Sequence, residues 1–234
     1  VGVLRINSLT DGEANEIRAR LQDLVKQGAQ KIVIDVRDTA GGSLTEAVTV
    51  ANLFIKDGVL AQTIGKEGKA LKTFTADPKA TIFSGPVVAL IDTGTAGAAE
   101  VIASALSERN RGQVVGEKSF GAGTEQQLYT LRGGDGLLLT TVKWASSNGK
   151  PFLGEDRAHS GVAPNVEVKG QEVSDAVDPD DLTGNDDDAI KQPDQSNEKR
   201  DVTPAPATKP AVEDIQMKKA LELLKDKPAS QRAA

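Results

Sequence analysis

An α/β domain with a largely parallel sheet is the fold class that this sequence predicts. Two strand–turn–helix units follow one another, with turns of small residues at 40–42 and 92–96. Strands that alternate with helices are typical of such sheets. The chain has 234 residues, 38% of them hydrophobic, enough for one domain of ordinary size with additional segments. Because ligands in these folds bind beyond the carboxyl ends of the strands, we expect the site at loops 38–42 and 93–98.

The spacing of apolar residues defines each element in order. Runs of β-branched and aliphatic residues predict strands, and apolar residues three and four apart predict helices. The predicted strands cover 1–7, 31–36, 59–64, 70–75, 86–91, 113–116, 127–131, 137–144 and 165–168, and the predicted helices cover 14–25, 44–54 and 98–106. Residues 8–11 supply N-cap candidates for the first helix, and Gly65 to Gly68 makes 59–75 a surface hairpin.

Composition changes near Gly170, which divides the chain. Residues 171–234 carry 15 acidic and 9 basic side chains, so the whole net charge of −6 belongs to them, and they contain no aromatic residue. We therefore predict a globular core over 1–170 and a disordered, acidic, Pro-rich linker over 171–210. A short amphipathic helix is predicted over 211–227, and we expect it to dock on the core or on a partner.

Composition also excludes several kinds of chemistry. There is no cysteine and one histidine, His159, which excludes disulfide scaffolds, thiolate zinc sites and multi-histidine metal sites, so no metal or cofactor is expected. A Ser-His-Asp triad would have to use that single imidazole, so a hydrolase here is expected to use a Ser-Lys pair. The negative net charge argues against a nucleic-acid partner. No run of 18 apolar residues is present to span a membrane.

Three ordered motifs resemble those of the C-terminal processing (tail-specific) serine proteases. They are DVRDTAGG at 35–42, DTGTAGAAE at 92–100 and GEKSFGAGTEQ at 116–126, and the segments 161–166 and 219–225 are also similar. The resemblance implies a core like the β/α spiral of crotonases and Clp proteases. Family members cut proteins near their C-termini after a PDZ domain has captured the tail. That domain is expected upstream of Val1, and an extracytoplasmic location, in the periplasm or cell envelope, is expected by resemblance.

The resemblance also assigns site residues, and two of them depart from the family pattern. The nucleophilic serine is replaced by Gly97 and the general-base lysine by Ala122, while the family's glutamine is present as Gln126. The backbone N–H groups of Ala98 and of Gly41 or Gly42 are expected to form the oxyanion hole. Without a hydroxyl and an amine at the two positions, we predict no measurable peptide hydrolysis.

Other polar residues near the motifs are interpreted as structural. We expect Lys118 and His159 to be exposed, Glu100 to favour the dipole of its helix, and Asp35 and Asp38 to cap turns, and we regard Thr93, Thr95, Ser84 and Ser119 as weak alternatives for a nucleophile. None of these residues restores the missing pair.

Three functions stay open at this point. The first is an inactive core of a tail-specific protease, and the accompanying Ala99, where the family often has another serine, favours natural divergence over deliberate substitution. The second is a pseudoprotease that binds the C-terminal tails of proteins or peptides, or that acts in assembly. The third is a crotonase-like enzyme that stabilises an enolate, for which no acyl-CoA signature is present. Time-dependent cleavage of an unstructured protein separates the first two.

Overall fold

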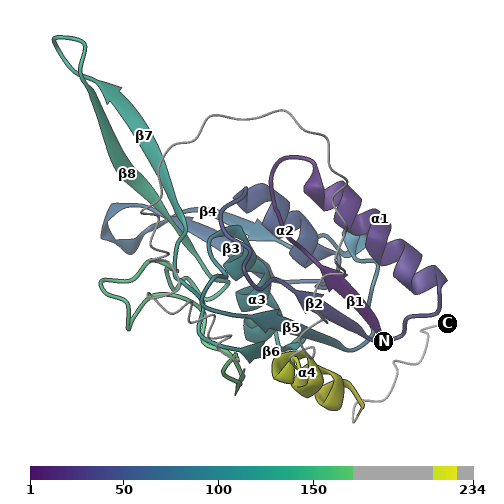
Figure 1. The fold of residues 1–234 in the computed structure, drawn as a ribbon. Coiled ribbons are helices and arrows are strands. Elements are labelled where there is room, and N and C mark those ends of the chain that lie inside the picture. Colours follow the sequence, from purple (N-terminus) through teal and green to yellow (C-terminus); the bar gives the residue numbers. More distant parts are fainter. Residues whose placement is uncertain (171–212, 226–234) are drawn as a thin grey trace, which may run out of the picture. The chain divides into compact units, whose positions relative to one another are not determined.

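A five-stranded parallel sheet forms the centre of the structure, a computed structural model that describes residues 1–170 and 213–225. Its strand order is β1-β2-β5-β6-β9, and every pairing within it is parallel. The strands are β1 (Gly2–Arg5), β2 (Ile32–Asp35), β5 (Val87–Ile91), β6 (Gln113–Gly116) and β9 (Val166–Glu167). The predicted α/β class with a parallel sheet is confirmed (Figure 1).

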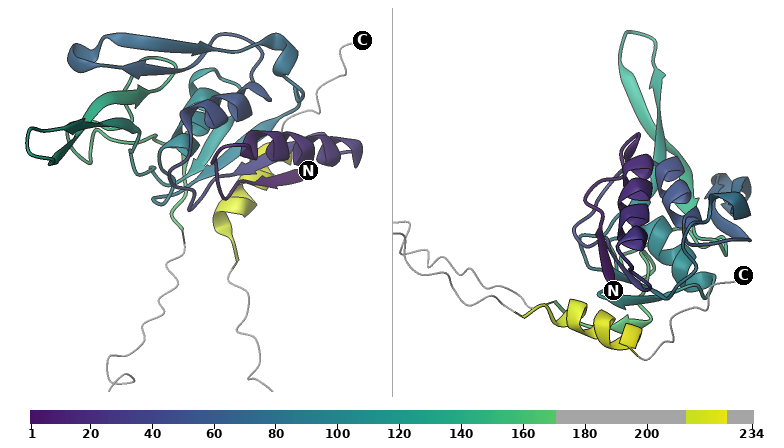
Figure 2. Two further views of the ribbon diagram at one scale, coloured as in Figure 1. Left: turned by 90° about the horizontal axis from the view of Figure 1, so that it is seen from above. Right: turned by 90° about the vertical axis from the view of Figure 1, so that its right-hand side faces the viewer.

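Helices cover both faces of this sheet. On one face lie α1 (Glu13–Lys26), α2 (Leu44–Asn52) and α3 (Ala98–Glu108), and on the other lies α4 (Ile215–Lys225) (Figure 2). Successive side chains of a strand point to opposite faces. Ile32 and Ile34 of β2 therefore join the core under α1 to α3, whereas Val33 packs with Ala220 and Leu224 of α4.

Four further strands form a separate antiparallel sheet in the order β4-β3-β8-β7. They are β3 (Val59–Ile64), β4 (Ala70–Thr75), β7 (Thr124–Thr130) and β8 (Gly136–Ala145). The predicted hairpin over 59–75 is confirmed, with a short 3-10 turn at Lys66–Gly68, and a second 3-10 turn lies at Pro78–Ala80. The sequence predicted these strands but not their common sheet. Two hairpins, β3–β4 and β7–β8, form it, and the pairing of β3 with β8 joins strands that lie far apart in the chain.

Several boundaries differ from those predicted. Helix α1 begins at Glu13 behind the N-cap residue Gly12, whose φ of 95° takes the place of the side-chain cap expected within 8–11. Strand β7 begins at Thr124 because polar residues pair with β8 along its first half. The predicted linker over 171–210 and the two ends of the predicted helix over 211–227 lie outside the described residues. Within the described residues, no helix is long and apolar enough to cross a membrane.

Candidate active site

The three sequence motifs converge beyond the carboxyl ends of β2, β5 and β6. Backbone hydrogen bonds join their loops directly: the Ala96 N–H donates to the Thr39 carbonyl at 2.9 Å, and the Phe120 N–H donates to the Thr95 carbonyl at 2.8 Å. Loops from adjacent strands of a parallel sheet meet at one edge, which is where this fold class places its ligand sites. The loop 117–123 therefore lies beside loops 38–42 and 93–98, where the site is expected.

Gly97 lies at the sharp turn between β5 and α3, as the N-cap residue of the helix. Its φ of 63° and ψ of −115° form a conformation that L side chains rarely adopt and that stores strain where a side chain is present. A Cβ atom built on Gly97 would lie 3.4 Å from the Gly41 carbonyl oxygen, an ordinary contact. The turn therefore has room for a small side chain aimed at the Gly41 loop, and glycine leaves that space without a functional group.

Glu100 connects the turn before α3 with the loop 117–123 through a buried carboxylate. Its Oε2 accepts the N–H groups of Gly97 at 2.9 Å and Ala122 at 2.8 Å, and its Oε1 accepts the Ser119 hydroxyl at 2.5 Å and the Gly121 N–H at 2.8 Å. Burial raises the pKa of Glu100, while these four donors act in the opposite direction. The backbone N–H groups of Gly97 and Ala122 therefore donate to the same atom, Oε2 of Glu100.

This positioning role of Glu100 and Ser119 was missed by the sequence analysis. Glu100 does lie in the first turn of α3, where a negative charge suits the helix dipole, but its main partners come from other loops. The Ser119 hydroxyl also accepts the Val162 N–H at 2.7 Å, so it links the loop to the segment before β9. One signal was available: Glu100 is the only charged residue in 98–106, where every other residue except Ser104 is apolar.

The backbone groups expected to form an oxyanion hole are engaged with each other. The Ala98 N–H donates to the Gly41 carbonyl oxygen at 3.1 Å, so it does not face open space. Gly41 and Gly42 have φ values of 74° and 91°, which glycine adopts at little cost. In this conformation the Gly41 carbonyl takes the place in which an acceptor for the Ala98 N–H would lie.

The remaining predicted site residues lie outside the Glu100 network. Gln126 is exposed on β7, where it pairs with Thr140. The Lys118 amine donates to the Ala158 carbonyl at 2.6 Å and is only half-exposed, so it holds a loop rather than standing free as expected. The His159 side chain is 73% exposed, as expected, and lies 2.7 Å from Asp156.

The alternative nucleophiles are accounted for by structure. Thr95 is fully buried, and its hydroxyl donates to the Val36 carbonyl at 2.9 Å, a turn-stabilising role in agreement with the sequence interpretation. Thr93 and Ser84 are exposed, and Ser84 precedes β5 at the opposite end of the sheet.

Two aspartates beside the site have different surroundings. Burial would raise the pKa of Asp35, but hydrogen bonds from Arg37 and Arg5 and the charge of Arg37 hold it below its usual value. The charge of Asp92 and partial burial raise the pKa of Asp38, whose N–H donates to Asp92 at 3.0 Å. The Asp35 carboxylate accepts the Arg37 N–H at 3.2 Å, which is the capping role predicted for it, whereas at Asp38 it is the carboxylate of Asp92 that caps the turn.

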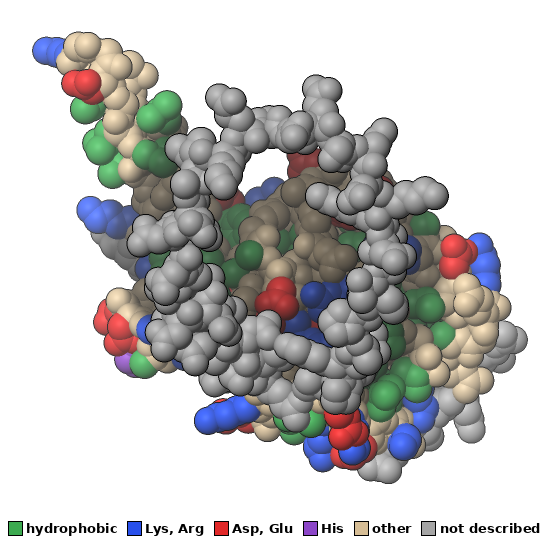
Figure 3. All heavy atoms as spheres, in the orientation of Figure 1, with side chains coloured by type: hydrophobic (Ala, Val, Ile, Leu, Met, Phe, Trp, Pro, Cys, Tyr) green, Lys and Arg blue, Asp and Glu red, His purple; other side chains and the backbone are tan. Residues whose placement is uncertain are grey.

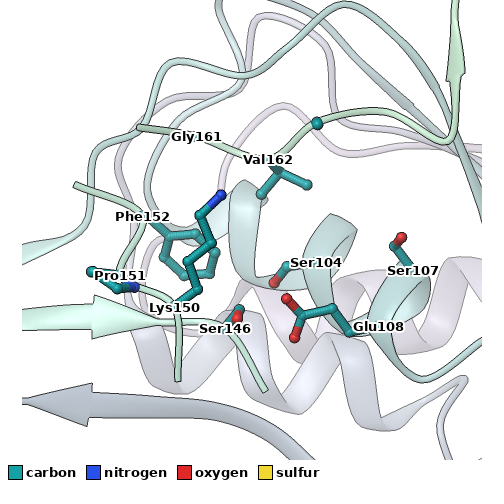
Figure 4. A pocket seen from close by; sticks show the side chains of 10 residues that line it. Ser104, Ser107, Glu108, Ser146, Lys150, Pro151, Phe152, Gly161 and Val162 are labelled. Carbon is teal, nitrogen blue, oxygen red and sulfur yellow. The ribbon is translucent and has the colours of Figure 1, made fainter. Parts of the chain in front are cut away.

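A separate cavity of about 110 Å³ lies beside the second half of α3 (Figure 4). Ser104, Glu108, Ser146, Lys150 and Phe152 line it, and none of the predicted catalytic positions does. Within the described chain, no group of three or more metal-binding side chains gathers anywhere.

Comparison with known proteins accounts for this arrangement of loops. The chain is 33% identical over 144 residues to the carboxyl-terminal-processing protease of Synechocystis sp. (62% of this chain, 33% of the relative), and 31% identical over 150 residues to carboxy-terminal processing protease CtpA of Bacillus subtilis (64% and 32%). The solved photosystem II D1 C-terminal processing protease superposes with a TM-score of 0.63 at 28% identity, covering 70% of this chain and 41% of that one.

The chain thus spans about a third of the length of these curated relatives. The family model for peptidase family S41 matches residues 1–168, nearly all of the part with the parallel sheet and the converging loops. The chain therefore belongs to peptidase family S41, a family of serine peptidases.

Proposed function

We propose that this chain is the core of a C-terminal processing peptidase that no longer hydrolyses peptides. In this proposal Gly97 stands at the nucleophile position and Ala122 at the general-base position. The observation that carries it is the shared acceptor, because the N–H groups of both residues donate to Oε2 of Glu100. Side chains at the two positions would be neighbours, as a nucleophile and its base must be.

Glycine and alanine supply neither a hydroxyl nor an amine at these neighbouring positions. Loss of such groups in serine proteases lowers the rate by about 10⁴ to 10⁶. Nearby groups are already engaged: the Thr95 hydroxyl donates within its own turn and the Lys118 amine donates to loop carbonyls. The closed pair of Ala98 and Gly41 also supports the proposal, since a substrate carbonyl would have to displace it.

The direct test is incubation with an unstructured protein that ends in an apolar tail. We expect no time-dependent shortening by mass spectrometry over a period in which an active C-terminal processing protease completes the reaction. Clear cleavage that persists after further purification of the chain would show that the proposed inactivity is wrong.

Restoration of the pair gives the complementary test. The double variant Gly97→Ser, Ala122→Lys should cleave the same protein, because it supplies both missing groups and a Cβ at position 97 meets ordinary contacts at 3.4 to 3.6 Å. The φ of 63° strains a serine there, so circular dichroism must first show that the double variant folds. Each single variant is the matched control and should stay inactive, because a hydroxyl needs its base. A folded double variant without cleavage would contradict the assignment of the two positions.

A second candidate function is a pseudoprotease that binds peptide tails or takes part in assembly. The exposed apolar side chains of the β7–β8 hairpin (Figure 3) favour this candidate, because a contiguous apolar group on a surface is typical of an interaction site. Fluorescence anisotropy with labelled peptides that end in apolar residues tests it: saturable binding without cleavage supports tail capture, and no binding excludes it for this chain. The upstream PDZ domain and the extracytoplasmic location stay predictions.

A further inference from the structure

The cavity beside the second half of α3 has polar walls that the proposed catalytic positions do not share. It measures about 110 Å³ and lies between α3, the turn at 146–152 and the segment 161–163 (Figure 4). An apolar cavity of about 150 Å³ holds one benzene molecule, so this cavity suits a ligand of about six non-hydrogen atoms or fewer. The side chains that line it decide which chemical groups such a ligand carries.

Ser146 contributes a hydroxyl that has no partner. The residue is 3% exposed, and its Oγ is the one buried side-chain polar atom among the described residues that makes no hydrogen bond. Its backbone N–H, in contrast, donates to the Lys150 carbonyl at 2.8 Å and so fixes the turn. A buried hydroxyl without a partner costs free energy, and folded proteins normally pair such groups. A ligand with an acceptor oxygen would supply the missing bond.

Two opposite charges line the same cavity without neutralising each other. Glu108 uses Oε2 to accept the Ser147 hydroxyl at 2.6 Å and the Asn148 N–H at 2.9 Å, which leaves Oε1 for another donor. The exposed Lys150 amine makes no hydrogen bond or ion pair with any described residue, Glu108 included. A ligand that carries one charge of each sign can therefore pair with both side chains at once.

We propose that this cavity binds a small free amino acid, glycine or L-alanine. Its ammonium group pairs with Glu108, and its carboxylate accepts hydrogen bonds from the Lys150 amine and the Ser146 hydroxyl. Bonds of this kind, with a charged donor or acceptor, are the stronger ones. Phe152 and Val162, which also line the cavity, offer an apolar surface to the methyl group of alanine.

The same contacts argue against a ligand with a single charge. A cation alone would leave Lys150 and the Ser146 hydroxyl without a partner, and an anion alone would leave Oε1 of Glu108 without one. A ligand this small makes few contacts, so we expect a dissociation constant on the order of millimolar. The inference goes beyond the proposed function and does not depend on whether the chain hydrolyses peptides.

Titration of the isotope-labelled full chain with L-alanine, followed by NMR, tests the proposal. Saturable shifts are expected for the backbone amides of 146–150 and 161–163. Lys150→Met should weaken binding by about tenfold or more, because the ligand carboxylate loses its charged partner. The matched control is Lys69→Met, which removes the same charge from an exposed lysine outside the cavity and should bind as the unaltered chain does.

Ser146→Ala separates a role in binding from a role in the fold. Removal of the unpaired hydroxyl should raise the urea midpoint of the chain without ligand, because an uncompensated buried group is lost. The same change should weaken the binding of L-alanine. If binding is unchanged in Ser146→Ala and in Lys150→Met, the proposed contacts are wrong.

Two ligands that each lack one charge complete the test. L-alaninamide keeps the ammonium group without the carboxylate, and propionate keeps a carboxylate without the ammonium group. Both should bind about tenfold more weakly than L-alanine. Equal binding of either one would overturn the proposal in favour of a site for a single charge. No saturable shift with L-alanine well above millimolar concentration would mean that the cavity holds water only.

Discussion

Replacement of Glu100 by glutamine should destabilise the fold although the two side chains have the same shape. Glutamine keeps one acceptor oxygen and replaces the other by an amide donor. An amide nitrogen at the Oε2 position would face the N–H groups of both Gly97 and Ala122, whereas at the Oε1 position it would face the Gly121 N–H and a Ser119 hydroxyl that can also accept. The second orientation is favoured, and it leaves one buried N–H without a partner.

An unsatisfied buried N–H costs about 1–3 kcal/mol. Part of this loss is recovered, since burial raises the pKa of Glu100 and glutamine removes that buried charge. We therefore expect Glu100→Gln to lower the free energy of unfolding by about 1–2 kcal/mol at pH 7, measured by urea denaturation with circular dichroism.

A matched control lies on the same helix. Glu108 accepts the Ser147 hydroxyl and the Asn148 N–H, both through Oε2, so glutamine can keep both bonds with its amide group on the free side. Glu108→Gln should therefore stay within about 0.5 kcal/mol of the unaltered chain. If Glu100→Gln is as stable as the unaltered chain, or if the two variants lose equal stability, the reasoning that Glu100 holds the loops together is refuted.

Three further predictions concern the turns and the core. Asp38→Asn should stabilise the chain by less than about 1 kcal/mol at pH 7, because the charge of Asp92 and partial burial raise the pKa of Asp38. With the aspartate, stability falls as the pH rises from 3.8 through that raised pKa. Urea denaturation should therefore show the gain at pH 7 and none at pH 3. Gly116→Ala should cost more than about 3 kcal/mol, since its Cβ would lie 1.9 Å from a carbonyl oxygen of β5 at a φ of 129°, whereas Gly133→Ala, also at positive φ but with open space, should cost much less in the same measurement. Leu224→Ala should lower the unfolding free energy by about 2–4 kcal/mol because the side chain is fully buried, and a loss under about 0.5 kcal/mol would mean that α4 does not pack as described.

Local pattern predicted most of the elements of the fold. Strands β2 and β5 could be predicted as continuous apolar runs, because strands of a parallel sheet are buried on both faces. The order of the loops along the chain was also sufficient to place Gly97 in the expected region of the sheet edge. The antiparallel sheet was not predicted, since the partner of each short strand depends on contacts distant in sequence.

The candidate site was predicted in part. The motif comparison predicted the positions of Gly97 and Ala122, but the hydrogen bonds that bring them to one carboxylate come from Glu100, which the sequence treated as a helix-end charge. The oxyanion hole stays a prediction, and in the structure the Ala98 N–H expected to form it donates to the Gly41 carbonyl. Because glycine permits several orientations of its peptide groups, the sequence does not determine which one is adopted.

By itself, the sequence determined the class of fold, the absence of cysteine and the identity of Gly97 and Ala122, because composition and residue identity settle which chemical groups exist. Only the tertiary structure decided where those groups lie. Glu100 and Ser119 join the turn before α3, the loop 117–123 and the segment before β9, the Ala98 N–H is already bonded, and an apolar hairpin is exposed in the described domain. The physical reason is that hydrogen-bond partners and burial are properties of residues far apart in the chain, and they are fixed only when the sheet brings its loops together.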